Sequence, residues 1–276
     1  MSAQAFFIVS SGRSGTAMLH KALLAAGNVD MYHEYMVQIL QPLAVRRYHD
    51  LISHAEAKEV LSQTHGAAVH YCEREFWGDS SNKLSWLIPE LSTLLPEAKF
   101  VHLVRDGRKV TGSYFRKLGA ECYDDRSSLI LARHLSAPGH VPPPPPEKQY
   151  WWPQAKSDSF WGAAFGHFSQ FERIAWHWCE VNQVILNALA SLPAARHHFV
   201  RLEDIHDTPD ALYALLDFLG LRKGPDLLAM FQRPHNVNRP EDQLLNPEEA
   251  AAFTRIAEPM MQCLGYGERA EYVVNY

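Results

Sequence analysis

The sequence AFFIVSSGRSGT at residues 5–16 decides the fold class, because an apolar run leads directly into a loop of small residues. Residues 5–9 are apolar throughout, as in a strand that is covered on both faces. Met18, Leu19, Leu23 and Leu24 then follow at helical spacing. A glycine-rich loop at a helix N-terminus lets backbone N–H groups converge on an anion, and the helix dipole favours negative charge there. The stretch predicts a strand, a helix and a phosphate-binding loop between them, made of Ser11, Gly12, Arg13, Ser14, Gly15 and Thr16.

This loop differs from the Walker A motif of P-loop nucleotide-binding proteins. That motif places a lysine after its last glycine, where this chain has Thr16, and the basic residue Arg13 precedes Gly15 by two positions. The loop therefore predicts an anion site without the lysine that phosphoryl-transferring kinases of this type use.

Three further β-rich apolar runs predict strands at residues 67–71, 99–104 and 197–202, and each leads into a segment with helical spacing. This alternation predicts an α/β fold, with a central parallel sheet of about five strands flanked by helices. Residues 165–189 predict one long helix. Helix starts are predicted at Ser53, at Asn246 and at Thr208–Pro209, the last ending at Gly220.

Composition points to one soluble domain spanning residues 1–276. Apolar residues make up 47% of the 276 residues and charged residues 21%, and the formal net charge is −5. This balance disfavours disorder and a surface that binds nucleic acid throughout. The N-terminus lacks a signal peptide, so we expect no membrane span and a cytoplasmic location. Four cysteines lie far apart, which predicts reduced thiols and no metal site: Cys72, Cys122, Cys179 and Cys263.

Residues 119–160 do not fit the strand and helix pattern. Five prolines at 142–146 stand near Tyr150, Trp151 and Trp152. Polyproline is stiff and enters neither a helix nor an inner strand. We interpret this segment as an irregular insertion on the acceptor side that acts as a lid, with Trp151 and Trp152 binding the substrate.

A second basic cluster follows the strand predicted at residues 99–104. It reads KFVHLVRDGR, with Ser113 beyond it, and residues 99–117 hold six basic side chains and one acidic side chain. Ligands of open α/β sheets bind beyond the carboxyl ends of the strands, where both Arg13 and Arg105 are expected. An anion loop at one strand end and an arginine side chain at another suit a ligand with two separated anionic groups.

Together, SGRSGT and KFVHLVRDGR with its following serine resemble the two nucleotide-binding motifs of the sulfotransferases, closest in spacing to tyrosylprotein-type and bacterial members. Weaker resemblances extend over most of the chain, at VRLEDI, LLDFLGL and MMQCLGY. The resemblance implies a P-loop-like sulfotransferase fold and the donor 3′-phosphoadenosine 5′-phosphosulfate (PAPS), with no metal. It assigns the 5′-phosphosulfate to residues 13–16 and the 3′-phosphate to Arg105 and Ser113.

Transfer of a sulfuryl group requires a base for the acceptor hydroxyl or amine and charge stabilisation on the donor. Glu34, 21 residues after Arg13, has a spacing similar to that of the catalytic glutamate of related enzymes. His33, which we also expect near the substrate, and His70 are alternative bases. Arg13 and Lys83 are expected to stabilise the transferring group.

The C-terminal donor contacts are less defined, with Asn238 and Arg239 as candidates, and the sequence RKG at residues 222–224 is interpreted as a chance match to a family motif. The acceptor could be a small molecule, glycan, lipid or peptide. A P-loop-type kinase and a noncatalytic nucleotide-binding protein remain the alternative functions.

Overall fold

The computed structural model describes residues 3–25, 27–223 and 244–271, which form two compact units. Unit 1 takes the described residues within 1–36, 54–105 and 183–238, and unit 2 those within 37–53, 106–182 and 239–276. That the chain forms one domain stays a prediction.

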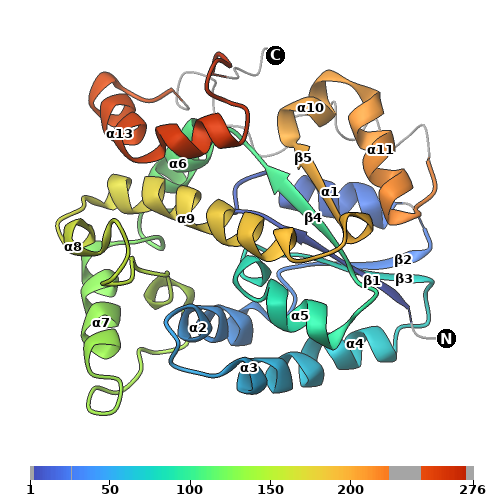
Figure 1. The fold of residues 1–276 in the computed structure, drawn as a ribbon, viewed down its shortest axis with the longest axis horizontal. Coiled ribbons are helices and arrows are strands. Elements are labelled where there is room, and N and C mark those ends of the chain that lie inside the picture. The colour runs from blue at the N-terminus through green and yellow to red at the C-terminus, as the bar shows by residue number, and fades with distance from the viewer. Residues whose placement is uncertain (1–2, 26, 224–243, 272–276) are drawn as a thin grey trace. The chain divides into compact units, whose positions relative to one another are not determined.

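Unit 1 contains a parallel sheet in the order β2-β3-β1-β4-β5, which confirms the predicted α/β fold and the expected five strands (Figure 1). Strand β1 is central, and β3 lies between β1 and β2. The strands are β1 Gln4–Val9, β2 Val29–His33, β3 Phe76–Ser80, β4 Lys99–Val104 and β5 His197–Arg201.

Side chains of β1 alternate between the two faces of the sheet, and both faces are covered. Phe6 and Ile8 belong to one apolar cluster with residues of α1 and α11. Phe7 packs on the opposite face against Trp77 and Phe100. This double coverage explains why the strand is apolar at every position. Figure 1 shows α1 and α11 on one side of the sheet and α3, α4 and α5 on the other.

Helix α11 of unit 1 has the boundaries that the sequence predicts. Helix α11 starts at Pro209 and ends before Gly220, whose left-handed conformation (φ 84°) closes it as predicted. The longer helices are α1 Thr16–Leu24, α3 His54–Leu61, α5 Ile88–Leu94, α10 Leu202–Asp207 and α11 Pro209–Leu219; short turns are Ser62–Gly66 (π), α4 Ala67–His70, and the 3₁₀ turns Leu84–Trp86 and Ala194–Arg196.

The strand predicted at residues 67–71 is wrong. These residues continue a helical stretch that starts at His54 and includes the π turn Ser62–Gly66. In their place β2 and β3 complete the sheet. Both strands mix polar and apolar residues, as in VDMYH and FWGDS, so apolar runs alone do not reveal them.

Unit 2 is helical. Its helices are α2 Val37–Tyr48, α6 Gly107–Leu118, α7 Asp125–Ser136, α8 Gly162–Phe165, α13 Pro247–Cys263 and the first part of α9 Gln170–Ala190, with a 3₁₀ turn at Lys148–Tyr150. Helix α13 has the predicted capping box, in which Asn246 and Glu249 bond each other's backbone N–H groups. Helix α9 begins five residues later than predicted, after a separate short α8.

Residues 119–160 are less irregular than predicted, because α7 occupies the middle of this segment. Asp124 caps α7 by accepting from the backbone N–H of Ser127 at 2.9 Å. All four cysteines are free thiols, as predicted. In the described part of the chain we find no helix long and apolar enough to cross a membrane, and no group of three His, Cys, Asp or Glu side chains arranged for a metal.

Candidate active site at the carboxyl ends of β1, β3 and β4

The predicted anion loop joins β1 to α1 and is built around internal hydrogen bonds. Ser14 Oγ donates to the carbonyl of Gly12 at 3.1 Å, and Ser14 Oγ lies 3.2 Å from Ser11 Oγ. The N–H of Gly12 donates to Ser10 Oγ at 3.0 Å, so this N–H group shapes the loop and is not directed at a ligand.

The end of the loop presents the start of α1. Gly15 is the N-cap residue of α1, in a left-handed conformation (φ 88°), and no side-chain hydrogen bond caps the helix. A Cβ at Gly15 would lie 2.7 Å from Leu202 Cδ1, so the Leu202 side chain would have to move, and the left-handed backbone itself favours glycine. The N–H groups of Met18 and Leu19 donate to the Gly15 carbonyl at 3.0 Å, and no side chain takes the place of an anion at the start of α1.

Arg13 and Arg105 meet at this loop. Arg105 directly follows β4, and its Nη1 donates to the carbonyl of Arg13 at 3.1 Å. Arg13 has a positive φ of 54°, which is unusual for a residue other than glycine. The structure thus brings together the two basic residues that the sequence placed at the ends of separate strands.

Glu34 follows β2, at the edge of the same sheet. Its backbone is left-handed (φ 58°), as is that of Met36 (φ 54°). The N–H of Glu34 donates to the carbonyl of Ser80 at 3.1 Å, and the N–H of Tyr35 donates to Asp79 Oδ1 at 3.2 Å. Non-glycine residues in this conformation cluster at functional sites, where the surrounding structure holds them.

The two alternative histidine bases differ in position. His33 ends β2 with Nδ1 2.9 Å from both the carbonyl and the Oγ of Ser80. The carbonyl bond makes Nδ1 a donor, which leaves Nε2 as the imidazole acceptor. His70 ends α4 and precedes β3, so it lies toward the amino ends of the strands and away from Glu34.

Lys83 belongs to a buried segment beyond β3. Its N–H donates to Ser81 Oγ at 3.2 Å, and the residue is only 4% exposed. The segment also contains Ser85, whose Oγ donates to the carbonyl of Ser10 at 2.9 Å and accepts from the Ser10 N–H at 3.0 Å. These two bonds fasten the beginning of the anion loop to the segment that carries Lys83.

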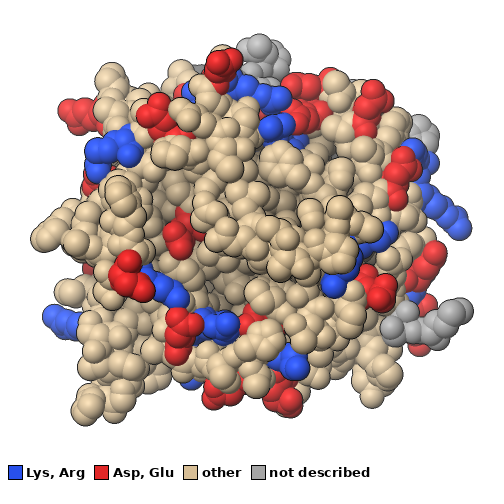
Figure 2. Space-filling model, in the orientation of Figure 1, with Lys and Arg blue, Asp and Glu red and all other residues tan. Residues whose placement is uncertain are grey.

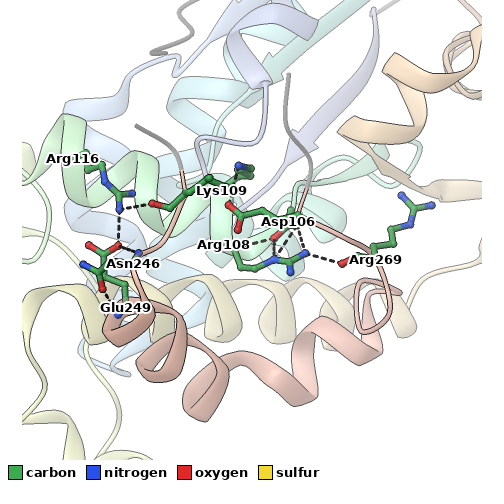
Figure 3. A network of polar contacts seen from close by, with 9 residues as sticks. Asp106, Arg108, Lys109, Arg116, Asn246, Glu249 and Arg269 are labelled. Atoms are coloured by element: carbon green, nitrogen blue, oxygen red, sulfur yellow. Dashed lines mark hydrogen bonds and ion pairs between the residues drawn. The ribbon is translucent and has the colours of Figure 1, made fainter. Parts of the chain in front are cut away.

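Ser113 lies on α6 in unit 2, together with several basic residues of the second motif. Figure 3 shows that these basic side chains are engaged within unit 2. Arg108 forms a bidentate pair with Asp106 (2.7 Å for Nη2–Oδ2), and Arg116 pairs with Glu249 at 2.5 Å. Lys109 is 2% exposed and pairs with Glu271 at 2.8 Å.

Trp151 and Trp152 are buried and pack within unit 2. Trp151 packs against Val45 and Leu131 and donates from Nε1 to the carbonyl of Pro145 at 2.7 Å. Trp152 packs against Tyr123 and donates to the carbonyl of Glu121 at 2.7 Å. They are 3% and 4% exposed. Contact of either with an acceptor stays an untested prediction.

Some predicted residues lie outside the described chain, and others were missed. Asn238, Arg239 and Gly224 fall in residues 224–243, which the structure does not describe. Sequence reasoning did not find Asp79, Ser80 or Ser85. The only available signal was the polar sequence DSSNKLS, which starts at the carboxyl end of a strand that the pattern did not reveal.

Charge is mixed on the face of the molecule that Figure 2 draws. On the face drawn in Figure 2, described Lys and Arg side chains are interspersed with Asp and Glu. Electrostatic attraction of an anionic ligand is therefore expected to come from local groups such as Arg13 and Arg105.

This fold and this loop define a class: an α/β protein whose first strand leads through a glycine- and serine-rich anion loop into a helix. Comparison with known families is consistent with that class. Residues 5–130 match the model described as the sulfotransferase family. No curated protein sequence gives a match.

Solved structures show the same fold. A sulfotransferase from Alicyclobacillus acidocaldarius is 13% identical, with a TM-score of 0.55, and the match covers 98% of each chain. A sulfotransferase from Mycobacterium avium is 11% identical, with a TM-score of 0.51, and the match covers 95% of this chain and 77% of that one. The family match over residues 5–130 and the fold shared with these two structures agree with the resemblance to sulfotransferases seen in the sequence.

Proposed function

We propose that the protein is an enzyme that transfers a sulfuryl group from PAPS to a hydroxyl or amine acceptor. The observation that carries this proposal is the meeting of Arg13 and Arg105 at the anion loop, where the Arg105 Nη1 lies 3.1 Å from the Arg13 carbonyl oxygen. PAPS presents a 5′-phosphosulfate and a 3′-phosphate. A helix start without a side-chain cap, in a loop whose Arg13 carbonyl accepts from the Arg105 guanidinium, is suited to such a doubly anionic ligand.

The residues have separate roles in the reaction. Residues 11–16 bind the 5′-phosphosulfate through the start of α1, and Arg105 binds the 3′-phosphate. The acceptor oxygen or nitrogen attacks sulfur, Glu34 takes the acceptor proton, and the bond from sulfur to the bridging oxygen breaks. The 3′,5′-bisphosphate then leaves with that oxygen and its electron pair.

Stabilisation of the leaving oxygen falls to Arg13 and Lys83, since developing negative charge is stabilised best by groups that are already in place. Thr16 opens α1 and contributes its N–H group to the 5′-phosphate. Ser113, Asn238 and Arg239 remain predicted donor contacts that rest on the resemblance alone.

Donor recognition is tested by calorimetry with the 3′,5′-bisphosphate and with 5′-AMP. The loss of a charged hydrogen-bonded contact costs roughly 1.5 to 3 kcal/mol, so the bisphosphate should bind about 10 to 150 times more tightly. Arg105→Ala should remove most of this difference.

Arg196 provides the matched control. It also donates to backbone carbonyls, those of Leu95 and Ala98, but it precedes β5 and so stands at the opposite ends of the strands. Arg196→Ala should keep the preference for the bisphosphate. Equal affinity of the wild-type protein for both nucleotides would contradict the proposal, and tighter binding of ATP with Mg²⁺ would favour a kinase.

The acceptor class is found by incubating the protein with sulfur-labelled PAPS and panels of phenols, glycans, lipids and peptides. Label transfer to one panel identifies the substrate. Donor binding without transfer to any acceptor would favour a noncatalytic nucleotide-binding protein.

A further inference from the structure

Strand β3 lies between β1 and β2 in the sheet, so its carboxyl end adjoins both the anion loop after β1 and the Glu34 loop after β2. Its last residue, Ser80, pairs with Ile8 of β1 and with His33 of β2. The anion loop follows β1 within two residues of Ile8, and Glu34 directly follows His33. The end of β3 therefore sets the separation between these two loops.

Residues 79 and 80 hold the backbone of the Glu34 loop. The Ser80 carbonyl accepts from the Glu34 N–H, and Asp79 Oδ1 accepts from the Tyr35 N–H. Tyr35 stands between two residues with positive φ, Glu34 and Met36. Left-handed backbone is unfavourable for such residues, so this loop needs hydrogen bonds from its surroundings to keep its conformation.

Asp79 is itself fixed by a second partner. Its Oδ2 lies 3.2 Å from His65 Nε2, and neither side chain is exposed. His65 belongs to the π turn Ser62–Gly66, a rare helical form that often occurs at functional sites. The His65 ring packs against Phe7, Tyr35 and Trp77. A buried carboxylate that is paired on one oxygen and accepts from the backbone on the other has one stable orientation.

We propose that Asp79, oriented by His65, is a positioning residue that holds Glu34 in place for proton transfer. This inference rests on the proposed function, since it assumes that Glu34 is the base. Asp79 touches the Tyr35 backbone and acts on the reaction through it. Small displacements of a catalytic group reduce turnover strongly, by up to about 100-fold per ångström.

The test compares Asp79→Ala, Asp79→Asn and Glu90→Ala. Glu90 is a matched control, because it is a buried carboxylate of unit 1 that pairs with a histidine, His54, at 3.0 Å. None of the hydrogen bonds described above connects Glu90 to residues 34–36. Each variant is measured for kcat with labelled PAPS and the acceptor from the screen, for bisphosphate affinity by calorimetry, and for melting temperature.

We expect Asp79→Ala to lower kcat about 10- to 100-fold while bisphosphate affinity stays within about two-fold. Asp79→Asn should recover most of the lost turnover, because an amide oxygen still accepts from the Tyr35 N–H and the amide NH₂ can donate to a neutral His65. Glu90→Ala should keep kcat even where it lowers the melting temperature.

A double variant keeps the proposal testable if Asp79→Ala does not fold. His65→Leu with Asp79→Leu replaces the pair with apolar side chains of similar size, which buried pairs often tolerate. It should fold and still show the low kcat. Amide hydrogen exchange adds a readout without substrate, in which the Tyr35 N–H should exchange at least about ten times faster in this variant than in the wild type.

Two results would overturn the role of Asp79 while the proposed function stands: turnover in Asp79→Ala equal to that in Glu90→Ala, or an Asp79→Asn variant as slow as Asp79→Ala. A wild-type protein that transfers the label to none of the acceptors would instead contradict the proposed function. The two failures are therefore distinguishable.

Discussion

Glu34 is the residue on which the proposed chemistry depends most. It is partly buried after β2, and its N–H is bonded to Ser80. Glu34→Ala should reduce kcat by ~100-fold or more and leave bisphosphate affinity nearly unchanged, as expected for a proton acceptor outside the nucleotide site. Steady-state kinetics and calorimetry on the same preparation measure both quantities.

His33 provides the comparison for that experiment. His33 precedes Glu34 in the chain, and the bond from its Nδ1 to the Ser80 carbonyl leaves Nε2 able to accept a proton. His33→Ala should keep much of the turnover. Should His33→Ala abolish transfer while Glu34→Ala retains it, the base is the histidine.

Residues of the site differed in how well the sequence revealed them. Arg13 and Arg105 were predictable because Arg13 lies in the loop after one strongly apolar strand and Arg105 directly follows another, and parallel strands bring their carboxyl ends to one edge. Asp79 was not predictable, because its role depends on contacts with His65 and Tyr35, 14 and 44 positions away in the chain.

Among the elements, the loop from α7 to α8 stabilises unit 2 through the buried side chain of Trp151. Trp151 is buried, packs against α2 and α7, and bonds through its indole N–H. Truncation of a buried tryptophan costs roughly 3 to 5 kcal/mol, so Trp151→Ala should lower the free energy of unfolding by about that amount. Urea unfolding followed by circular dichroism measures it.

Phe160 is the control for this prediction, since it lies in the same unit and is 89% exposed. Phe160→Ala should change the free energy of unfolding by less than about 0.5 kcal/mol. Equal losses in the two variants would mean that Trp151 does not pack as described.

The apolar run of β4 and the apolar stripe of α11 were predicted well, whereas the mixed patterns of β2 and β3 did not reveal these strands. Residues 67–71, AAVHY, combine apolar and aromatic residues as a strand does, yet they complete a helix that begins 13 positions earlier. Short apolar runs do not distinguish a strand from a buried helical turn, and tertiary packing decides between them.

At the scale of the whole molecule, the free energy of unfolding should fall at acidic pH because of His49. Burial, with Lys156 nearby, lowers the pKa of His49 from 6.5 to about 4. The Nε2 of His49 accepts from the Gln154 N–H at 3.3 Å, which requires a neutral ring. The unfolded chain therefore binds a proton that the folded protein does not bind, and stability is lost as the pH falls from about 6.5 toward 4.

From pH 7 to pH 5 this residue should reduce the free energy of unfolding by about 2 kcal/mol. Chemical unfolding at a series of pH values tests this. His49→Gln keeps a possible acceptor for Gln154 and does not titrate, so its pH dependence should be flatter by that amount. Parallel pH curves for the two proteins would show that His49 is not the cause.

The C-terminal contacts of α6 have a practical consequence for anyone who expresses this protein. Arg108 Nη2 bonds the Arg269 carbonyl at 3.0 Å, and buried Lys109 pairs with Glu271 (Figure 3). A shortened clone that stops before Arg269 would leave the buried ammonium of Lys109, on the helix that carries Ser113, without Glu271. Affinity tags are therefore better placed ahead of Met1, and chain ends designed for crystallisation should retain residues through Glu271.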